Sequence, residues 1–292
     1  MILITGATGQ LGKATTHFLI NKIPAGEVAV MVRDEAKAEN LKAKGVEVRT
    51  GDYTNYESMV KAFTGVDKLF LISSNDMAGQ RANHHINAIN AAKAAGVKHI
   101  IYTSFDTRDA ANTAVAAVTD DHVKTVAHLK ETGIPYTLLN NNLYADVLPG
   151  FLGEQVLEQG IFFPAGNGKV PFATREDMAE AAANILASEG HEGKEYVLAS
   201  DTNYTFHDVA EGLSEIAGKK VNYHSPTPEE YAVALTGAGV PEGYVGFFNA
   251  FGKAISDDEF NTGKSDLRQL LGRKPTSLQD YLKSTYAGAK TN

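Results

Sequence analysis

The stretch Gly6-Ala7-Thr8-Gly9-Gln10-Leu11-Gly12 lies between a short apolar run, residues 2–5, and a segment with helical spacing. Gly6 permits a tight turn, Gly9 lets backbone N–H groups approach a phosphate, and Gly12 allows close packing of helix on strand. The helix N-terminus adds partial positive charge at the same place. The spacing is G-x-x-G-x-x-G, and the alternative is a strand–helix turn without a ligand. Its place at the first strand–helix junction predicts a pyrophosphate site formed by Gly6, Thr8, Gly9, Gln10, Leu11 and Gly12.

Apolar runs with strand character recur beyond this turn. They are continuous and do not alternate, as expected for a parallel sheet covered by helices on both faces. Helical segments at 87–95 and 123–132 end at Gly96 and Gly133, where a left-handed cap favours glycine. The repeated β-α-β pattern predicts an α/β fold with a doubly wound parallel sheet of the Rossmann type. The expected strands are 2–5, 28–32, 46–49, 69–73, 99–104 and 136–139.

The second half of the chain is less regular. A helix is expected at 176–187 with Thr174 as its N-cap, followed by a strand at 195–199. From residue 205 onward the pattern is mainly helical, which predicts a smaller, mainly helical C-terminal substrate lobe. We expect residues 1–142 and 171–204 to form an NAD(P)-binding domain and residues 143–170 and 205–292 to form the substrate lobe.

Composition and charge exclude several classes of function. The chain has 292 residues, with 27 Lys and Arg against 35 Asp and Glu, which gives a net charge of −8. Such a chain is a poor binder of nucleic acid or of anionic membranes through its net field. With no Cys, disulfides and thiolate chemistry are excluded. No apolar run approaches the roughly 18 residues of a membrane span, and the start lacks the basic leader of a signal peptide, so we expect a cytoplasmic protein.

The histidines do not have the spacing of metal ligands. His84 and His85 are adjacent and point to different helix faces, and His122 and His128 are six positions apart. No acidic residue completes either pair with suitable spacing. We therefore expect no metal site.

The end of the second strand predicts the choice of cofactor. The run 28–32 is followed by Arg33 and Asp34. At this place an acidic residue accepts from the 2′-hydroxyl of NAD, whereas an arginine pairs with the 2′-phosphate of NADP. Because Arg33 comes first we expect NADP(H), and Asp34 leaves NAD(H) open. An ordinary surface Arg–Asp pair is the alternative.

Polar residues follow three further strands at the carboxyl edge, where open α/β sheets bind ligands. Asp52 is a candidate acceptor for the adenine amino group, with Tyr53 beside the ring, and a turn-forming Asp is equally compatible with the sequence. Hydroxyl groups at this edge can reach the ribose or the nicotinamide amide. The remaining candidates for cofactor binding are Ser73, Ser74, Thr103 and Ser104.

Taken together, these residues resemble the NmrA-like group of atypical short-chain dehydrogenase/reductases, and the bacterial NADPH-dependent quinone oxidoreductases and triphenylmethane reductases in particular. The resemblance runs over essentially the whole chain and implies a small C-terminal lobe that closes a cleft over the nicotinamide. It rests on the glycine-rich turn, Val32-Arg33, Gly51-Asp52-Tyr53, 90–97, Tyr102-Thr103-Ser104, 133–139, Ala173-Thr174-Arg175-Glu176-Asp177, 190–194 and 270–275.

The chain departs from this resemblance at specific positions. The corresponding helix has no Tyr-x-x-x-Lys pair of the kind found in typical short-chain dehydrogenases. The family register places His122 where related reductases have the catalytic Lys, and the pattern of the quinone reductase subgroup also has His there, followed by Thr-Glu. Thr125 is kept, but Val126 replaces a Glu. Asn140-Asn141-Asn142 replaces the usual Arg-Asn-Gly after the paired leucines.

His122 is a candidate for chemistry. If Asp120-Asp121-His122 begins a helix, the positive end of the dipole favours a neutral imidazole that accepts a hydrogen bond or relays a proton, although nearby carboxylates act in the opposite direction. A surface histidine at a helix start is the alternative reading.

Reduction of a quinone requires little from the protein beyond stacking a flat acceptor and excluding water. We therefore assign catalytic positions to His122, to Phe105 after the fifth strand, and to Tyr144 in the connecting region. The aromatic cluster at 243–252 either forms a mobile flap or packs as a helix into the lobe core, and the latter is the more common arrangement.

These observations predict an NAD(P)H-dependent oxidoreductase, independent of flavin and metal, that acts on a small aromatic or quinone-like substrate as a monomer or homodimer. A binding module of the NmrA type, which senses NAD(P) without catalysis, is the main alternative. An epimerase-like role shares the fold, but the missing Tyr-x-x-x-Lys disfavours it.

Overall fold

A parallel sheet of seven strands forms the centre of the molecule in the computed structural model, which describes residues 1–76 and 78–288. The strand order is β3-β2-β1-β4-β5-β6-β8, so the chain winds outward in both directions from the β1–β4 pair. This is the doubly wound topology, with its switch point at the carboxyl ends of β1 and β4. The strands are β1 (Ile2–Ile4), β2 (Val28–Val32), β3 (Glu47–Thr50), β4 (Lys68–Leu71), β5 (His99–Phe105), β6 (Tyr136–Asn141) and β8 (Glu195–Leu198).

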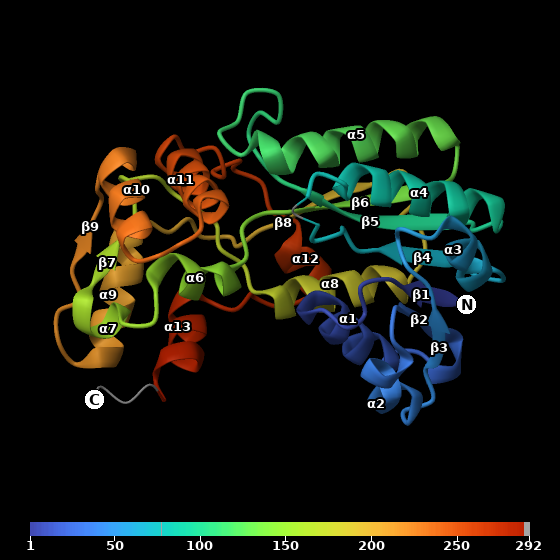
Figure 1. Cartoon of the computed structure of the whole chain (residues 1–292). Coiled ribbons are helices and arrows are strands. Elements are labelled where there is room, and N and C mark those ends of the chain that lie inside the picture. The colour runs from blue at the N-terminus through green and yellow to red at the C-terminus, as the bar shows by residue number, and fades with distance from the viewer. Residues whose placement is uncertain (77, 289–292) are drawn as a thin grey trace.

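Helices cover both faces of this sheet (Figure 1). Neighbouring residues of one strand enter different cores, as Leu3 packs on the α3–α4 side and Ile4 on the α1–α8 side. This explains why the central strands are apolar throughout, whereas β3, at the edge, has no fully buried residue. One face carries α1 (Gln10–Ile20), α8 (Arg175–Leu186) and α12 (Leu267–Leu271), and the other carries α3 (Tyr56–Phe63), α4 (Arg81–Ala94) and α5 (Ala116–Thr132).

A second group of elements packs around its own aromatic core. Phe163, Phe206 and Phe260 are fully buried there. The strands β7 (Ile161–Phe162) and β9 (Tyr223–His224) form a small parallel sheet beside it. The helices of this part are α6 (Leu148–Leu152), α7 (Val156–Gln159), α9 (Phe206–Ala217), α10 (Pro228–Gly237), α11 (Glu242–Ser256) and α13 (Leu278–Tyr286).

Short helical segments complete the chain. The helix α2 (Glu39–Lys42) and the 3₁₀ turns η1 (Ala25–Glu27) and η2 (Glu35–Ala38) connect β2 to its neighbours. The turn η3 (Ala145–Val147) precedes α6. None of the described helices has the length and apolar content needed to cross a membrane.

Several local predictions are confirmed. Thr174 caps α8 by accepting from the Asp177 backbone N–H, and Gly133 ends α5 in the left-handed conformation. Gly96 follows α4 with a φ of 77°. Two helix starts were placed too late, because α4 begins at Arg81 and α5 at Ala116. The faces that these helices bury near their starts include polar side chains, His85 in α4 and Thr119 and His122 in α5, so apolar spacing does not mark where the helices begin.

The aromatic cluster at 243–252 lies in helix α11 and is not a loop flap. Phe251 packs into the lobe core, whereas Tyr244 is exposed. The segment 265–276 leaves the lobe: Leu267 and Leu271 of α12 pack in the core beside α8, and Arg273 pairs with Asp177. The division of the chain into two domains stays a prediction. The segment 265–276, which that division places in the substrate lobe, packs against the side of the sheet.

Candidate functional site

The glycine-rich turn joins β1 to α1 and leaves backbone donors free. Gly6 has a φ of 60°, and the Gly9 N–H donates to the Gly6 carbonyl at 3.0 Å. A Cβ at Gly12 would lie 2.4 Å from that same carbonyl oxygen, so only glycine fits. The first helical hydrogen bond runs from the Lys13 N–H to Gly9. The preceding backbone N–H groups, of Gln10, Leu11 and Gly12, find no acceptor within the described chain, and they make the helix end suitable for an anion.

The side chains of this turn have different environments. Thr8 is exposed, whereas the Leu11 side chain is buried in the core. The Gln10 Oε1 accepts from the Arg175 guanidinium at 2.9 Å. Leu11 can therefore meet a ligand only through its backbone.

The carboxyl ends of β2 and β3 present one exposed cation. Arg33 makes no ion pair with any described residue. Asp34 accepts from the Ala36 N–H as the cap of η2, and Asp52 Oδ1 accepts from the backbone and hydroxyl of Thr54. The Tyr53 hydroxyl points inward, 2.6 Å from the Ile72 carbonyl oxygen. The carboxylates of Asp34 and Asp52 thus accept hydrogen bonds within local turns. The Arg33 guanidinium is the group available to an incoming anion.

Side chains behind the β4 loop fix its backbone. The Ser73 N–H donates to Thr103 Oγ1 and the Ser74 N–H donates to His85 Nε2, each at 2.8 Å. The Ser74 hydroxyl lies 3.1 Å from His84 Nδ1. Ser104, one residue beyond Thr103, lines a cavity on the α5 side of the sheet. The predicted hydroxyls of Ser74, Thr103 and Ser104 therefore have different surroundings.

A network of buried polar side chains extends from this loop to His122. Because His85 Nε2 accepts from Ser74, its proton resides on Nδ1, 2.9 Å from Thr125 Oγ1, and Thr125 donates onward to the Asp121 carbonyl. The Tyr102 hydroxyl lies 2.8 Å from His122 Nδ1. With Tyr102 as the donor, the proton of neutral His122 is on Nε2.

His122 is neutral for a different reason from the one predicted. It lies in the second turn of α5 and not at the helix N-terminus, so the helix dipole contributes little there. Burial lowers the pKa of His122 to about 3, with a further contribution from the positive charge of Arg81. Burial likewise lowers the pKa of His85 to about 3. The sequence left the balance between helix dipole and nearby carboxylates open, and burial is the main cause of the neutral form.

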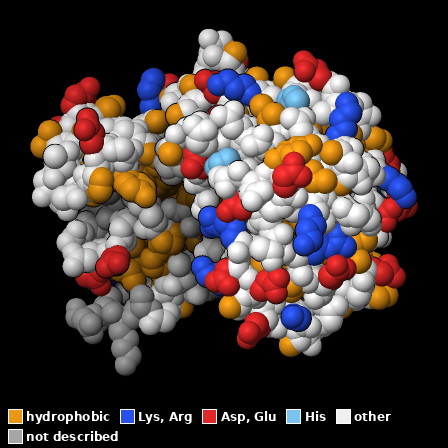
Figure 2. Space-filling model, turned by 45° about the vertical axis from the view of Figure 1, so that its right-hand side comes forward, with side chains coloured by type: hydrophobic (Ala, Val, Ile, Leu, Met, Phe, Trp, Pro, Cys, Tyr) orange, Lys and Arg blue, Asp and Glu red, His pale blue; other side chains and the backbone are white. Residues whose placement is uncertain are grey.

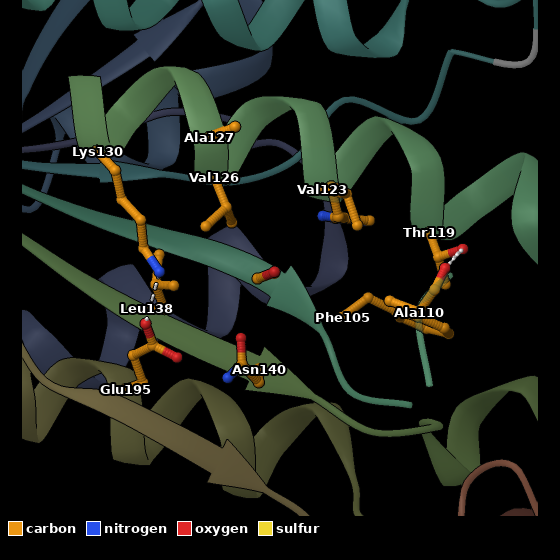
Figure 3. Close-up of a pocket in the computed structure, with 12 residues that line it drawn as sticks. Phe105, Ala110, Thr119, Val123, Val126, Ala127, Lys130, Leu138, Asn140 and Glu195 are labelled. Atoms are coloured by element: carbon orange, nitrogen blue, oxygen red, sulfur yellow. Dashed lines mark hydrogen bonds and ion pairs between the residues drawn. The ribbon is translucent and has the colours of Figure 1, made fainter. Parts of the chain in front are cut away.

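Phe105 covers the outer side of His122. The two rings are stacked at 6.0 Å with an angle of 16°, and Phe105 also meets Phe260 edge-on. Both Phe105 and His122 line a cavity of about 390 Å³ between α5 and the edge formed by β6 and β8. Figure 3 shows Val123, Val126 and Leu138 among its walls, with the Lys130–Glu195 ion pair at one end.

Tyr144 belongs to a second polar cluster, beside the glycine-rich turn. Its hydroxyl oxygen accepts from Asn141 Nδ2 at 2.9 Å, and the Arg175 guanidinium lies 4.4 Å from the centre of its ring. Arg175 also contacts Asp146 at 3.6 Å and reaches Gln10. Burial raises the pKa of the Tyr144 phenol. Because its oxygen is occupied as an acceptor, the phenol proton remains available for donation.

Several residues that build these clusters had no predicted role. Arg175 appeared only as part of a family-like motif, and His85 only as a rejected metal ligand. Tyr102 and Thr125 likewise appeared only as parts of the family-like pattern, with no role predicted for either. Their roles come from contacts between elements distant in the chain. In residues 1–76 and 78–288, no group of three His, Asp or Glu side chains could hold a metal ion.

Comparisons with known proteins agree with this architecture. The chain is 40% identical over 283 residues to quinone oxidoreductase 2 of Escherichia coli, covering 96% of both proteins. It is 29% identical to the NAD(P)H azoreductase of Xenophilus azovorans, covering 97% of each. The crystal structure of the Citrobacter sp. triphenylmethane reductase complexed with NADP(H) matches with a TM-score of 0.90 and 39% identity, covering 97% of this chain and 99% of that one. The model of the NmrA-like family matches residues 1–282, and the chain belongs to that family.

Proposed function

We propose that this chain is an NADPH-dependent oxidoreductase that transfers a hydride to a quinone or a similar conjugated aromatic acceptor. The observation that carries the proposal is the glycine-rich turn, with its free N–H groups at the start of α1 and no room for a Cβ at Gly12. The related triphenylmethane reductase was crystallised with NADP(H), and the relatives are named for quinone and azo reduction.

The described residues fit a dinucleotide across the carboxyl edge of the sheet. In this fold the pyrophosphate meets the first helix N-terminus and the adenosine lies near the second strand. Arg33, exposed and without an ion pair among the described residues, would bind the 2′-phosphate. The other residues proposed to contact the cofactor are Gly6, Thr8, Gly9, Gln10, Leu11, Gly12, Asp52, Ser73, Ser74, Thr103 and Ser104.

The chain's own residues position the acceptor and supply a proton. When bound, the reduced nicotinamide supplies a hydride, and one proton then completes the two-electron reduction of a quinone to a hydroquinone. The Tyr144 phenol and the Nε2–H of His122 are both donors, and Phe105 offers an aromatic face. Figure 2 shows a hollow lined with hydrophobic side chains on the left of the view, which suits a flat aromatic acceptor.

A direct assay tests the proposal. Purified protein is mixed with NADPH and benzoquinone or a triphenylmethane dye, and the absorbance of the reduced cofactor is followed. We expect oxidation of NADPH that depends on both protein and acceptor. Binding of NADPH without turnover over a panel of quinones and dyes would instead favour the non-catalytic sensor.

Two variants separate the proposed role of His122 as a proton donor from that of Phe105 in acceptor binding. His122→Ala should lower kcat only a few-fold, because solvent can supply the proton to an oxyanion that is already stabilised. Phe105→Ala should raise KM for the acceptor more than it lowers kcat. A complete loss of turnover in His122→Ala with normal NADPH affinity would show that acid catalysis dominates.

Cytoplasmic location and a monomeric or homodimeric state stay predictions. Size-exclusion chromatography tests the oligomeric state.

A further inference from the structure

The cavity between α5 and the β6–β8 edge, called here the α5 cavity, lies on the face of the sheet opposite to the glycine-rich turn. Leu138 and Asn140 of β6 line it, whereas Leu139 between them packs in the core that contains Leu11 of the turn. Figure 3 shows Asn140 pointing toward α5 and Val126 pointing down from that helix. The volume of about 390 Å³ is in the range of sites for small molecules.

Two departures from the family-like pattern meet in the α5 cavity. Val126 replaces a Glu and Asn140 replaces an Arg, and both side chains line the cavity. A Glu and an Arg at these positions would place opposite charges in the same space. Among the described residues that line it, only Lys130 and Glu195 are charged, and they pair with each other at 3.2 Å. The two replacements therefore leave a space without an unpaired charge.

A buried donor of the α5 cavity has no partner. His122 is 6% exposed and lines the cavity beside Phe105. Its Nδ1 accepts from the Tyr102 hydroxyl, so Nε2 carries the proton, and Nε2 makes no hydrogen bond to a described residue. The Asn140 side chain has no hydrogen-bond partner in the described part of the chain either. A molecule with an oxygen acceptor would satisfy both groups.

The walls of the α5 cavity indicate the class of that molecule. Val123, Val126 and Leu138 are apolar, and the Phe105 ring offers a flat face. The one ion pair at the end of the cavity is already formed, so a charged ligand would be buried without a partner. The lining residues therefore fit a small, neutral ring compound.

We propose that the α5 cavity binds a small neutral aromatic molecule that carries a carbonyl or phenolic oxygen. The oxygen accepts from His122 Nε2 and from the Asn140 amide, and the ring packs between Val126 and Leu138. Because the site depends on two replacements, we expect it in this chain and not in chains that keep the Glu and the Arg. The inference concerns binding and goes beyond the proposed hydride transfer.

The experiment measures binding without cofactor. Isothermal titration calorimetry gives the Kd of methyl 4-hydroxybenzoate, which is neutral, and of 4-hydroxybenzoate, which differs by a free carboxylate. The native protein should bind the ester at least about tenfold more tightly, because the carboxylate would find no free cation in the α5 cavity. Asn140→Arg should reverse this preference, since it adds one unbalanced positive charge to the cavity.

Further variants make the result specific to the α5 cavity. Val126→Glu combined with Asn140→Arg restores both charges, and it should weaken binding of both compounds at least about tenfold. Val126→Phe fills the space without a charge, and it carries this test if the double variant does not fold. Asn40→Arg makes the matched change at an exposed residue of α2, outside the cavity, and should keep the native preference. Thermal unfolding checks that each variant is folded.

Three results would overturn the assignment of the α5 cavity. They are native protein that binds neither compound, equal Kd values for the two compounds, and an Asn140→Arg variant that keeps the native preference. A native dimer that Val126→Glu dissociates in size-exclusion chromatography would also overturn it, because a second copy of the chain would then cover the cavity. None of these results concerns NADPH oxidation, so the reductase proposal is tested separately by its own assay.

Discussion

Two buried histidines make stability depend on pH. Burial lowers the pKa of His85 and of His122 to about 3, while an unfolded histidine titrates near 6.5. Below about pH 6.5 the unfolded chain therefore binds protons that the folded chain excludes. Their contribution to stability is complete above this pH and is lost as the pH falls toward the folded pKa.

We expect the free energy of unfolding to fall by about 1.4 kcal/mol per pH unit for each of these histidines below about pH 6. Urea unfolding at pH 7 and pH 5 measures this. His122→Gln should reduce the difference between the two pH values by the share of one histidine, because burial also lowers the pKa values of His85, His99 and His191, which are unchanged in this variant. The same substitution at the exposed His17 is the control. An unchanged difference in His122→Gln would mean that its imidazole is not kept neutral by the fold.

Arg33 allows a test of cofactor choice at a single side chain. Arg33→Ala should raise the Kd of NADPH about tenfold or more, because a charge-assisted hydrogen bond to a phosphate is worth about 1.5–3 kcal/mol. The Kd of NADH, which has no 2′-phosphate, should stay the same. Fluorescence titration measures both, and Lys37→Ala, an exposed cation four residues further on, is the control. Equal weakening of both cofactors would contradict the assignment.

At the scale of an element, α1 depends on close contact between its first turn and β1. In Gly12→Ala the new methyl group would lie 2.4 Å from the Gly6 carbonyl oxygen, so the helix must move away from the turn. We expect a loss of about 1–3 kcal/mol in stability, as for other overpacked sites, together with weaker NADPH binding. Thermal unfolding and cofactor titration check these effects.

Gly26→Ala provides the matched control for α1. A Cβ at Gly26 has nothing within 4 Å and requires no positive φ. This variant should keep native cofactor affinity and stability. If Gly12→Ala behaves like Gly26→Ala, the close approach is not essential for the turn.

At the scale of the whole molecule, Asn142 links the C-terminal lobe to the central sheet through side-chain hydrogen bonds. Its Nδ2 donates to Asp106 at 2.7 Å and to the Phe260 carbonyl at 3.0 Å, and Asp106 also accepts from Thr262 at 2.8 Å. Burial raises the pKa of Asp106. The Asn that departs from the family-like pattern therefore joins the end of β6 to the segment after α11.

Removing this tie should destabilise the protein. We expect Asn142→Ala to lower the free energy of unfolding by about 2 kcal/mol, because it leaves buried polar partners unpaired. Urea unfolding at neutral pH measures the change. Asn140→Ala, two residues earlier, should change stability by less than about 0.5 kcal/mol. Equal effects of the two substitutions would contradict a specific role for Asn142.

Sequence patterns predicted the sheet because each of its central strands is buried on both faces. Leu3 and Ile4 enter opposite cores, so successive residues of this strand are apolar, and this pattern in the sequence indicates a strand that is buried on both faces. The glycine-rich turn was equally readable, since Gly6 and Gly12 meet steric demands that few other residues satisfy. By contrast, α5 begins earlier than predicted because the face that it buries near its start carries Thr119, His122 and Thr125, so apolar spacing does not mark it.

The amino-acid sequence by itself determined the doubly wound sheet and the glycine-rich turn between β1 and α1, because local spacing and steric need encode both of them. Only the tertiary structure decided that His122 lies in the second turn of α5 beside Tyr102 and that Arg175 reaches Gln10. It also decided that the buried Asn141 Oδ1 has no hydrogen-bond partner among the described residues. These contacts join residues from separate elements. Burial and pairing are properties of packed elements, so no local pattern can specify them.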